Sequence, residues 1–248
     1  MKILAIDTSS KNASVAILEN KDTIIELNNN DEKTHSQKLM PMIDEALKKS
    51  NLLLDDINLI SCCLGPGSFT GVRIGIATAK AFVDSKKIPA VGISSLEALA
   101  YSLNKNGLIC SLINANNGNV YAGLFEIINN KTFISNLSFL SLKNINGEVS
   151  LNSLIEFIEK NTNSSTKYSS IYFTGDGTTL YKDLLEKLIF KKYKIIVCEG
   201  CTSTGISIGK IGYTNYKNGN YGDSGFLIPI YLRKSQAELA LEEKNKKE

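Results

Sequence analysis

Apolar and polar positions alternate along the first 27 residues in a way that predicts three short strands. The runs KILAID, SVAILE and TIIEL are rich in β-branched residues and are separated by polar turns. Helical spacing follows in THSQKLMPMIDEALKKSN, where Leu39 and Ile43 recur on one face. Thr34 and Gln37 fit a capping box at its start. Pro41 should kink this helix, because proline lacks an N–H and its ring meets the preceding turn.

Strands and helices alternate through the rest of the first half. INLISCCLG is typical of a buried strand, SFTGVRIGIATAKAFVDSK of a helix, PAVGIS of a strand and SLEALAYSL of a helix. The pattern then restarts, because AIDTSSKNASVAIL aligns with LINANNGNVYAGLF and places Asp7 on Asn114. Each copy is an apolar strand, a polar hairpin and a second apolar strand.

The second half repeats the same order of elements. A third strand, KTFISNLSFL, is followed by helix LNSLIEFIEK, strand SIYFTG, helix TTLYKDLLEKLIF, strand YKIIVC and helix STGISIGKIGYTNY. The repeat predicts two similar α/β domains with mixed sheets. We expect residues 1–103 to form the first domain and residues 104–220 the second. Residues 221–248 form a C-terminal segment that is a candidate to return to the first domain, with a charged tail that frays.

Composition narrows the class of protein. The 248 residues are 43% hydrophobic, which is enough for a sizeable core, and no apolar run approaches the length of about 20 residues that a membrane span needs. Asp7 comes too early for the apolar region of a signal peptide, so we expect a cytoplasmic protein without a membrane partner. The net charge of +3 gives no broad attraction for nucleic acid.

The five cysteines do not form a disulfide framework, because their number is odd and their spacing uneven. Cys198 and Cys201 make a lone C-x-x-C pair. A zinc site needs four ligands, and the single histidine, His35, is far away in sequence. Ordinary buried thiols are therefore favoured over a metal site, and we expect no metal and no cofactor.

The stretch CLGPGSFTGVRIGIATAKAF looks like a phosphate-binding loop but fails both tests for one. A Walker loop needs lysine and then serine or threonine after Gly71, and a dinucleotide fingerprint needs glycine where Thr70 stands. Ser68 or Thr70 can cap the helix. Gly71, Gly75 and Ala79 then share one helix stripe, although glycine inside a helix costs about 1 kcal/mol against alanine. The stripe is either tight packing within the domain or, as we favour, a docking face for another protein.

The duplicated unit resembles the actin, sugar-kinase and Hsp70 superfamily. In that superfamily, an acidic hairpin from each half faces a cleft that holds phosphates and metal. Asp7 keeps the first acid, but Asn114 is neutral, and Asp176 in TGDG brings negative charge where a phosphate needs donors. We treat these three residues as candidates for a residual nucleotide cleft. The alternatives are a turn-capping carboxylate for Asp7 and a plain tight turn at TGDG.

The segments ILAIDTS, HSQKLMPMIDEAL, LGPGSFTGVRIGIATAKA, GISSLEALA and PIYLRKSQAE together resemble the TsaB family of tRNA threonylcarbamoyladenosine biosynthesis. The resemblance implies a non-catalytic subunit that activates a TsaD-like catalytic paralogue. That paralogue transfers a threonylcarbamoyl group to the adenosine 3′ of the anticodon, in tRNAs that read codons beginning with A. A TsaE-like ATPase joins them, tRNA is reached only through the complex, and a homodimer is the alternative for the isolated chain. The competing function is a small ATP-dependent kinase or hydrolase of the same superfamily.

The resemblance also implies where the partner docks. The helices beginning near His35 and Ser68 should carry the interface, through His35, Leu39, Met40, Ile43, Ser68, Phe69, Gly71, Arg73, Gly75 and Ala79.

No catalytic residue is expected. Ser95 and Leu99 stand where the catalytic relative has two metal-binding histidines, so the i, i+4 metal pair is absent. Glu97 between them should lie on the helix surface or act as a cap. The family's second hairpin reads D-A-R, whereas residues 114–116 read N-A-N. This departure counts against a cleft function that needs those charges and leaves docking by the first domain untouched.

Overall fold

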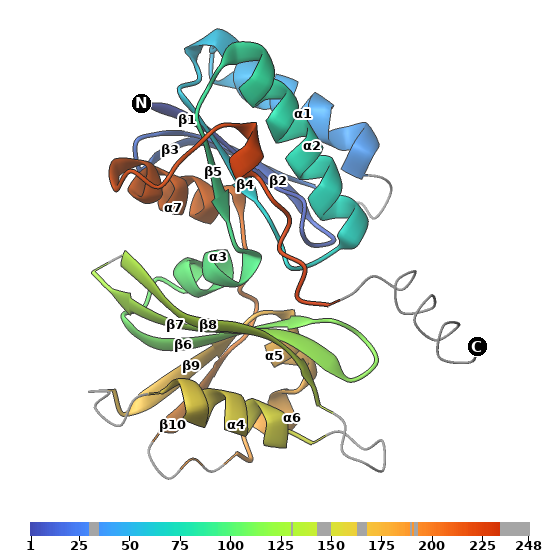
Figure 1. The fold of residues 1–248 in the computed structure, drawn as a ribbon, viewed down its shortest axis with the longest axis vertical. Helices are drawn as coiled ribbons and strands as arrows, with labels where there is room; N and C mark the ends of the chain where they lie inside the picture. The colour runs from blue at the N-terminus through green and yellow to red at the C-terminus, as the bar shows by residue number, and fades with distance from the viewer. Residues whose placement is uncertain are drawn as a thin grey trace, which may run out of the picture.

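A computed structural model describes residues 1–29, 35–129, 131–142, 150–162, 168–188, 190 and 193–233. Within these ranges the chain forms two α/β halves, one above the other in Figure 1. The expected capping residue Thr34, the side chain of His35 and the charged tail fall outside the described parts.

The first half contains a five-stranded mixed sheet. Its strands are β1 (Lys2–Asp7), β2 (Ala13–Glu19), β3 (Asp22–Asn29), β4 (Leu59–Cys63) and β5 (Ala90–Ile93). They lie in the order β3-β2-β1-β4-β5, with β1 antiparallel to β2 and parallel to β4. The middle strands read as nearly continuous apolar runs because helices cover both of their faces.

The second half repeats this sheet. Strands β6 (Gly107–Asn114), β7 (Asn119–Ile128), β8 (Lys131–Ser141), β9 (Ser170–Thr174) and β10 (Lys194–Cys198) lie in the order β10-β9-β6-β7-β8. Read from β8, this is the order of the first sheet, with the same pattern of antiparallel and parallel pairs. The predicted fold class, two similar halves with mixed sheets, is therefore confirmed.

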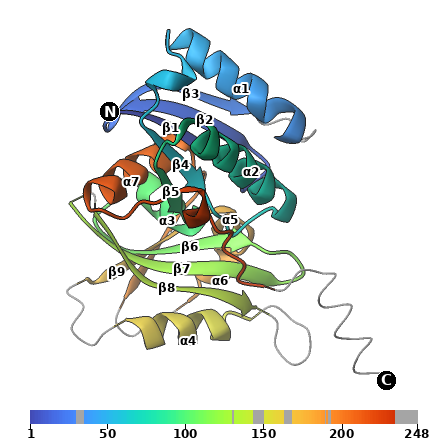
Figure 2. The same cartoon turned by 45° about the horizontal axis from the view of Figure 1, so that its top comes forward.

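Helices α1 (His35–Lys49) and α2 (Phe69–Lys86) pack side by side on one face of the first sheet (Figure 2). Leu39 and Ile43 of α1 are buried in the core beneath them. The α1 helix continues through Pro41 without a break. The short helix η1 (Leu54–Asp56) leads from α1 into β4.

The last helix of each half crosses to the other sheet. Helix α3 (Ser95–Ser102) follows β5 but packs on β6 and β7, so it lies between the two halves (Figure 1). Helix α7 (Gly205–Lys217) follows the second sheet but packs on β1, β2 and β5. The Ser61 hydroxyl on β4 donates a 2.8 Å hydrogen bond to the Ile208 carbonyl of α7. Helices α3 and α7 therefore each pack on the sheet of the other half. The two packed units do not coincide with the expected domains 1–103 and 104–220, because α7 lies with the first sheet.

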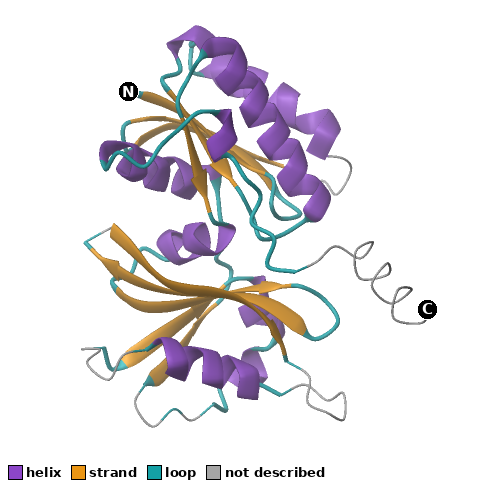
Figure 3. Cartoon of the chain, in the orientation of Figure 1, coloured by secondary structure: helices purple, strands orange, loops and turns teal. Residues whose placement is uncertain are grey.

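The outer face of the second sheet is covered by α4 (Asn152–Asn161), α5 (Asp176–Leu180) and α6 (Lys182–Leu185), as Figure 3 shows. The prediction of a single helix over TTLYKDLLEKLIF is wrong. Two short helices replace it, because the backbone leaves helical geometry at Tyr181, with φ −110° and ψ 20°.

After α7, the chain runs back across both halves as a segment that we call the C-terminal strap (residues 218–233). Gly222 pairs with Ala90 at the edge of the first sheet, and η2 (Ser224–Phe226) packs on α2. The Ile230 N–H donates a 2.8 Å hydrogen bond to the Leu64 carbonyl, and Leu232 packs against the apolar cluster between α3 and the second sheet. Among the described residues, no helix has the length and apolar character that crossing a membrane requires.

Candidate functional site

The glycine-rich turn before α2 holds two parts of the chain together. The Ser68 N–H donates a 2.7 Å hydrogen bond to the Ser9 carbonyl in the first hairpin. A side chain at Gly67 would collide with that same carbonyl, so the close approach requires glycine. The Ser68 hydroxyl caps α2 by accepting from the Gly71 N–H at 3.2 Å. The turn therefore serves hairpin contact and helix capping within the chain.

The stripe of Gly71, Gly75 and Ala79 faces the interior. All three residues are buried, and a Cβ atom at Gly75 would collide with the Thr8 hydroxyl. That hydroxyl donates a 2.7 Å hydrogen bond to the Gly71 carbonyl, which ties α2 to the end of β1. The prediction that this stripe meets a partner helix is wrong, because the sheet of the same half already occupies it.

The exposed side of α2 carries an ordered cluster that we call the Arg73 platform (Phe69, Arg73 and Tyr231). The Arg73 guanidinium lies 3.7 Å from the centre of the Phe69 ring, and its Nε–H donates a 2.8 Å hydrogen bond to the Tyr231 hydroxyl. The two rings are 5.3 Å apart, and 41% of Phe69 and 48% of Tyr231 remain exposed. Stacking on an aromatic face restrains a side chain that is otherwise flexible.

Tyr231 was missed as a site residue, although it lies in the PIYLRKSQAE segment that carries the family resemblance. Only the return of the C-terminal strap brings it to α2.

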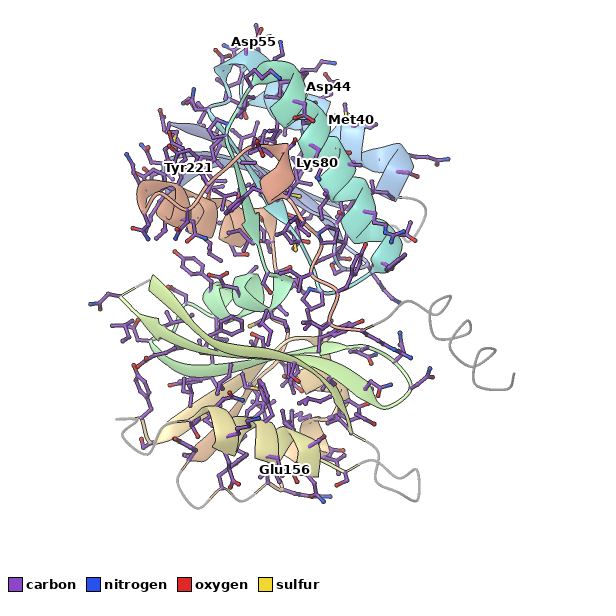
Figure 4. The ribbon with its side chains drawn as sticks, viewed as in Figure 1. Met40, Asp44, Asp55, Lys80, Glu156 and Tyr221 are labelled. Carbon is purple, nitrogen blue, oxygen red and sulfur yellow. The ribbon has the colours of Figure 1, made fainter. Side chains whose placement is uncertain are left out.

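The outer face of α2 continues from the platform as a row of small side chains. Ala77 and Ala81 are exposed one and two turns after Arg73. On the neighbouring α1, 50% of Met40 is exposed, and Figure 4 shows Met40 and Asp44 on this upper part of the molecule. We call the surface formed by the exposed residues Met40, Ala77 and Ala81 the outer α1–α2 face.

The structure thus separates the predicted interface residues into two groups. Exposed are Met40, Ser68, Phe69 and Arg73, and buried are Leu39, Ile43, Gly71, Gly75 and Ala79. His35 is the first residue of α1.

A cleft of about 420 Å³ lies between the halves. The first hairpin, the turn before α2, the second hairpin and the segment before α7 line it. The structure brings Asn114 and Asp176 together there, because the Asn114 N–H donates a 3.0 Å hydrogen bond to Asp176 Oδ1. The cleft therefore sits where the superfamily resemblance places it, between the two hairpins.

Asp7 lies beneath this cleft with only 1% of its surface exposed. One carboxylate oxygen accepts hydrogen bonds from the Ser9 N–H at 2.9 Å and the Ser9 hydroxyl at 2.7 Å. The other accepts from the Ser203 hydroxyl, in the segment that leads into α7. The turn-capping interpretation of Asp7 is confirmed, and Ser203 is a partner that no local sequence pattern indicated.

Glu97 lies inside the molecule, so the prediction that it occupies a helix surface is wrong. Only 7% of it is exposed, because α3 is enclosed between the second sheet and α7. Burial raises the pKa of its carboxyl to about 7. Ser95 and Leu99 line the cleft, and helical geometry places Glu97 on the opposite side of α3.

The five cysteines differ in how deeply they are buried. Cys62, Cys63 and Cys110 are buried, and burial raises the pKa of each thiol. Cys198 and Cys201 are half-buried at the end of β10, so the expectation of buried thiols is wrong for this pair. Within the described ranges, no three histidine, cysteine or acidic side chains gather in a way that could hold a metal ion.

Comparison with known proteins connects nearly the whole chain to one group. The family model for TsaD, the tRNA N6-adenosine threonylcarbamoyltransferase, matches residues 27–241. The chain is 31% identical over 239 residues to the tRNA threonylcarbamoyladenosine biosynthesis protein TsaB of Bacillus subtilis, a match that covers 96% of each chain. It is 40% identical over 124 residues to TsaB of Escherichia coli, which covers 49% of this chain and 53% of that one.

A solved structure shares the fold. YeaZ from Pseudomonas aeruginosa superposes with a TM-score of 0.75 at 20% sequence identity, and the match covers 93% of this chain and 99% of YeaZ. The match over 96% of the Bacillus subtilis protein identifies the family, whereas the structural match shows only the fold. This chain therefore belongs to the TsaB family of tRNA threonylcarbamoyladenosine biosynthesis proteins.

Proposed function

We propose that this chain is a non-catalytic subunit needed for threonylcarbamoyl transfer to tRNA, and that it docks on and activates a TsaD-type catalytic paralogue. The acceptor is the adenosine 3′ of the anticodon in tRNAs that read codons beginning with A. The full-length relative from Bacillus subtilis is named as a biosynthesis protein of this modification. The match to the TsaD family model supports a paralogous partner, since similar chains can pair through equivalent elements.

The observation that carries the non-catalytic assignment is the bonding of Asp7. Its two oxygens accept three hydrogen bonds from Ser9 and Ser203, and the carboxylate is buried beneath the cleft. A magnesium–phosphate site needs carboxylate oxygens that are open to the metal. This bonding disfavours the alternative of a small ATP-dependent kinase or hydrolase.

The outer α1–α2 face supports the choice of docking surface. Exposed Met40, Ala77 and Ala81 let another helix pair approach closely, because small side chains keep the backbones near each other. The Arg73 platform adds a restrained aromatic and cationic group, a combination enriched at interface hot spots. We assign this face to the TsaD-type paralogue, with a second copy of the chain as occupant when the paralogue is absent.

The remaining components join through that pair. A TsaE-like ATPase binds the assembled complex, and tRNA contacts this chain only within it. A net charge of +3 without a dense basic stripe supports weak tRNA binding by the isolated chain.

Reconstitution tests the proposal. The purified chain is mixed with the organism's TsaD-type paralogue, the ATPase, the threonylcarbamoyl donor and tRNA, and the modified nucleoside is measured with the chain present and omitted. We expect modification only when it is present, and no ATP turnover by the chain alone. Ala77→Glu should abolish co-purification with the paralogue, because it places a charge in the docking face. Leu180→Glu is the control, because Leu180 is exposed on α5 in the other half. Unchanged modification without the chain would contradict the proposal.

A further inference from the structure

Several polar side chains that line the cleft between the halves have no hydrogen-bond partner. Within the described parts of the chain, the half-buried side chain of Asn12 and the exposed side chains of Asn116 and Thr202 make no hydrogen bond to the protein, and neither does the amide nitrogen of the half-buried Asn114. They come from both hairpins and from the segment before α7. Polar groups that converge on one concave site without internal partners are typical of ligand recognition.

Three backbone donors of the two hairpins, in contrast, are already used. The N–H groups of Ser9, Asn114 and Asn116 bond to Asp7, Asp176 and Asn114, respectively. A phosphate group binds to free backbone N–H groups or to clustered cations. The lining holds one cation, Lys11, and one carboxylate, Asp176, so it contains no cluster of cations. The cleft is therefore poorly suited to a phosphorylated ligand.

The cleft also has an apolar side. Leu99 of α3 and Ile113 of β6 also line it. Its volume of about 420 Å³ lies within the range of roughly 300–1,000 Å³ that is typical of small-molecule sites. Amides and a hydroxyl can bond to ring hydroxyls of a ligand, while the apolar side chains pack on the ring face or on an attached base.

We propose that this cleft binds an uncharged, hydroxyl-rich small molecule, either a free sugar or an unphosphorylated nucleoside. The recognising groups are the side-chain amides of Asn12, Asn114 and Asn116 and the hydroxyl of Thr202. The shared chemistry is a ring with neighbouring hydroxyls and no phosphate. This binding does not depend on the proposed role in tRNA modification.

A pair of neighbouring asparagines allows a clean test. Asn116 and Asn117 both have left-handed backbone geometry, with φ of 61° and 54°, which glycine adopts without strain. Asn116 lines the cleft and Asn117 does not. Asn116→Gly removes one cleft amide and keeps the turn, and Asn117→Gly is the matched control. Thr202→Val removes the hydroxyl at nearly constant volume.

The full-length protein is titrated by calorimetry and by ligand-observed NMR with three sets of probes. The first is pentoses and hexoses, the second is unphosphorylated nucleosides, and the third is ATP with magnesium and inorganic phosphate. We expect saturable binding within the first or the second set, which tells the two sources apart. We expect Asn116→Gly and Thr202→Val each to weaken it about three- to tenfold, with Asn117→Gly unchanged. The proposal is overturned if no sugar or nucleoside binds up to about 10 mM, if ATP or phosphate binds more tightly than both, or if the control variant loses as much affinity.

Discussion

The Nε–H of Arg73 on α2 donates a 2.8 Å hydrogen bond to the hydroxyl of Tyr231, 158 positions further along the chain. The contact joins the C-terminal strap to α2 and holds the guanidinium over Phe69. A side chain that is already restrained loses less conformational entropy when a partner covers it. The strap therefore orders part of the surface that we assign to the paralogue.

Tyr231→Phe should weaken binding of the TsaD-type paralogue about two- to tenfold, because Arg73 loses the hydrogen bond that orients it. The free energy of unfolding should change by less than about 1 kcal/mol, because 48% of Tyr231 is exposed. Calorimetric titration and urea unfolding measure the two quantities. Tyr221→Phe is the control, since Tyr221 is also exposed on the strap but stacks on Tyr216 of α7. If the wild type and Tyr231→Phe bind the paralogue with equal affinity, the Arg73 platform is not part of the interface.

Two alanines on opposite sides of α2 should respond differently to the same change. Ala79→Leu overpacks a fully buried position and should lower the free energy of unfolding by about 1–3 kcal/mol. Ala77→Leu lies on the exposed side, should leave the stability within about 0.5 kcal/mol, and should reduce paralogue binding. Melting curves and pull-downs on both variants check this. The assignment of the two faces fails if Ala79→Leu melts normally and loses the partner.

Asp7→Asn should destabilise the protein by about 1.5–3 kcal/mol. An amide keeps one acceptor oxygen, but its NH₂ group cannot accept from the Ser9 or Ser203 hydroxyl. Ser203→Ala should cost less, since it removes one donor and leaves the Ser9 contacts in place. A double-mutant cycle by urea unfolding measures the coupling between residues 7 and 203. Additive effects would show that this contact does not stabilise the junction.

Glu97 should make stability depend on pH. Burial raises the pKa of its carboxyl from 4.5 to about 7, so the unfolded chain releases this proton at a lower pH than the folded chain. The contribution of Glu97 to the free energy of unfolding therefore falls as the pH rises from about 4.5 to about 7, by on the order of 3 kcal/mol, and is constant above that.

Glu97→Gln should remove this slope when urea unfolding is measured across the same pH range. Glu156→Gln, on the exposed surface of α4, should keep it (Figure 4). Parallel pH profiles for the wild type and Glu97→Gln would contradict the assignment.

Asn114→Asp restores an acid to the second hairpin but should not create an ATPase. Asp7 remains bonded to Ser9 and Ser203, and the Asn114 N–H is already used by Asp176. Phosphate release with ATP and magnesium should stay at background, with Asn114→Ala as the control for any change of fold. A clear rise for the aspartate variant alone would show that the cleft still supports phosphate chemistry.

Much of this architecture could be predicted from periodicity. Alternating apolar strands and amphipathic helices, repeated once, gave two sheets of the same strand order, and the alignment placed Asp7 and Asn114 at equivalent strand ends. The pattern succeeded because strand and helix periods depend on neighbours two to four positions away. The sequence did not predict that α3 and α7 each pack on the sheet of the other half. The apolar face of a helix indicates that the helix is buried but does not indicate which sheet covers it.

The sequence by itself determined the fold class, a capped start of α2 at Ser68 or Thr70 and the need for a close contact along the stripe that contains Gly75. The structure selected Ser68 as the cap. Only the tertiary structure decided that the stripe meets Thr8 and that the docking face lies on the other side of α2. It also decided that Glu97 is buried and that Arg73 finds Tyr231. The physical reason is that a close contact involves two surfaces. Local sequence describes one of them, and the partner surface is known only once folding brings distant residues together.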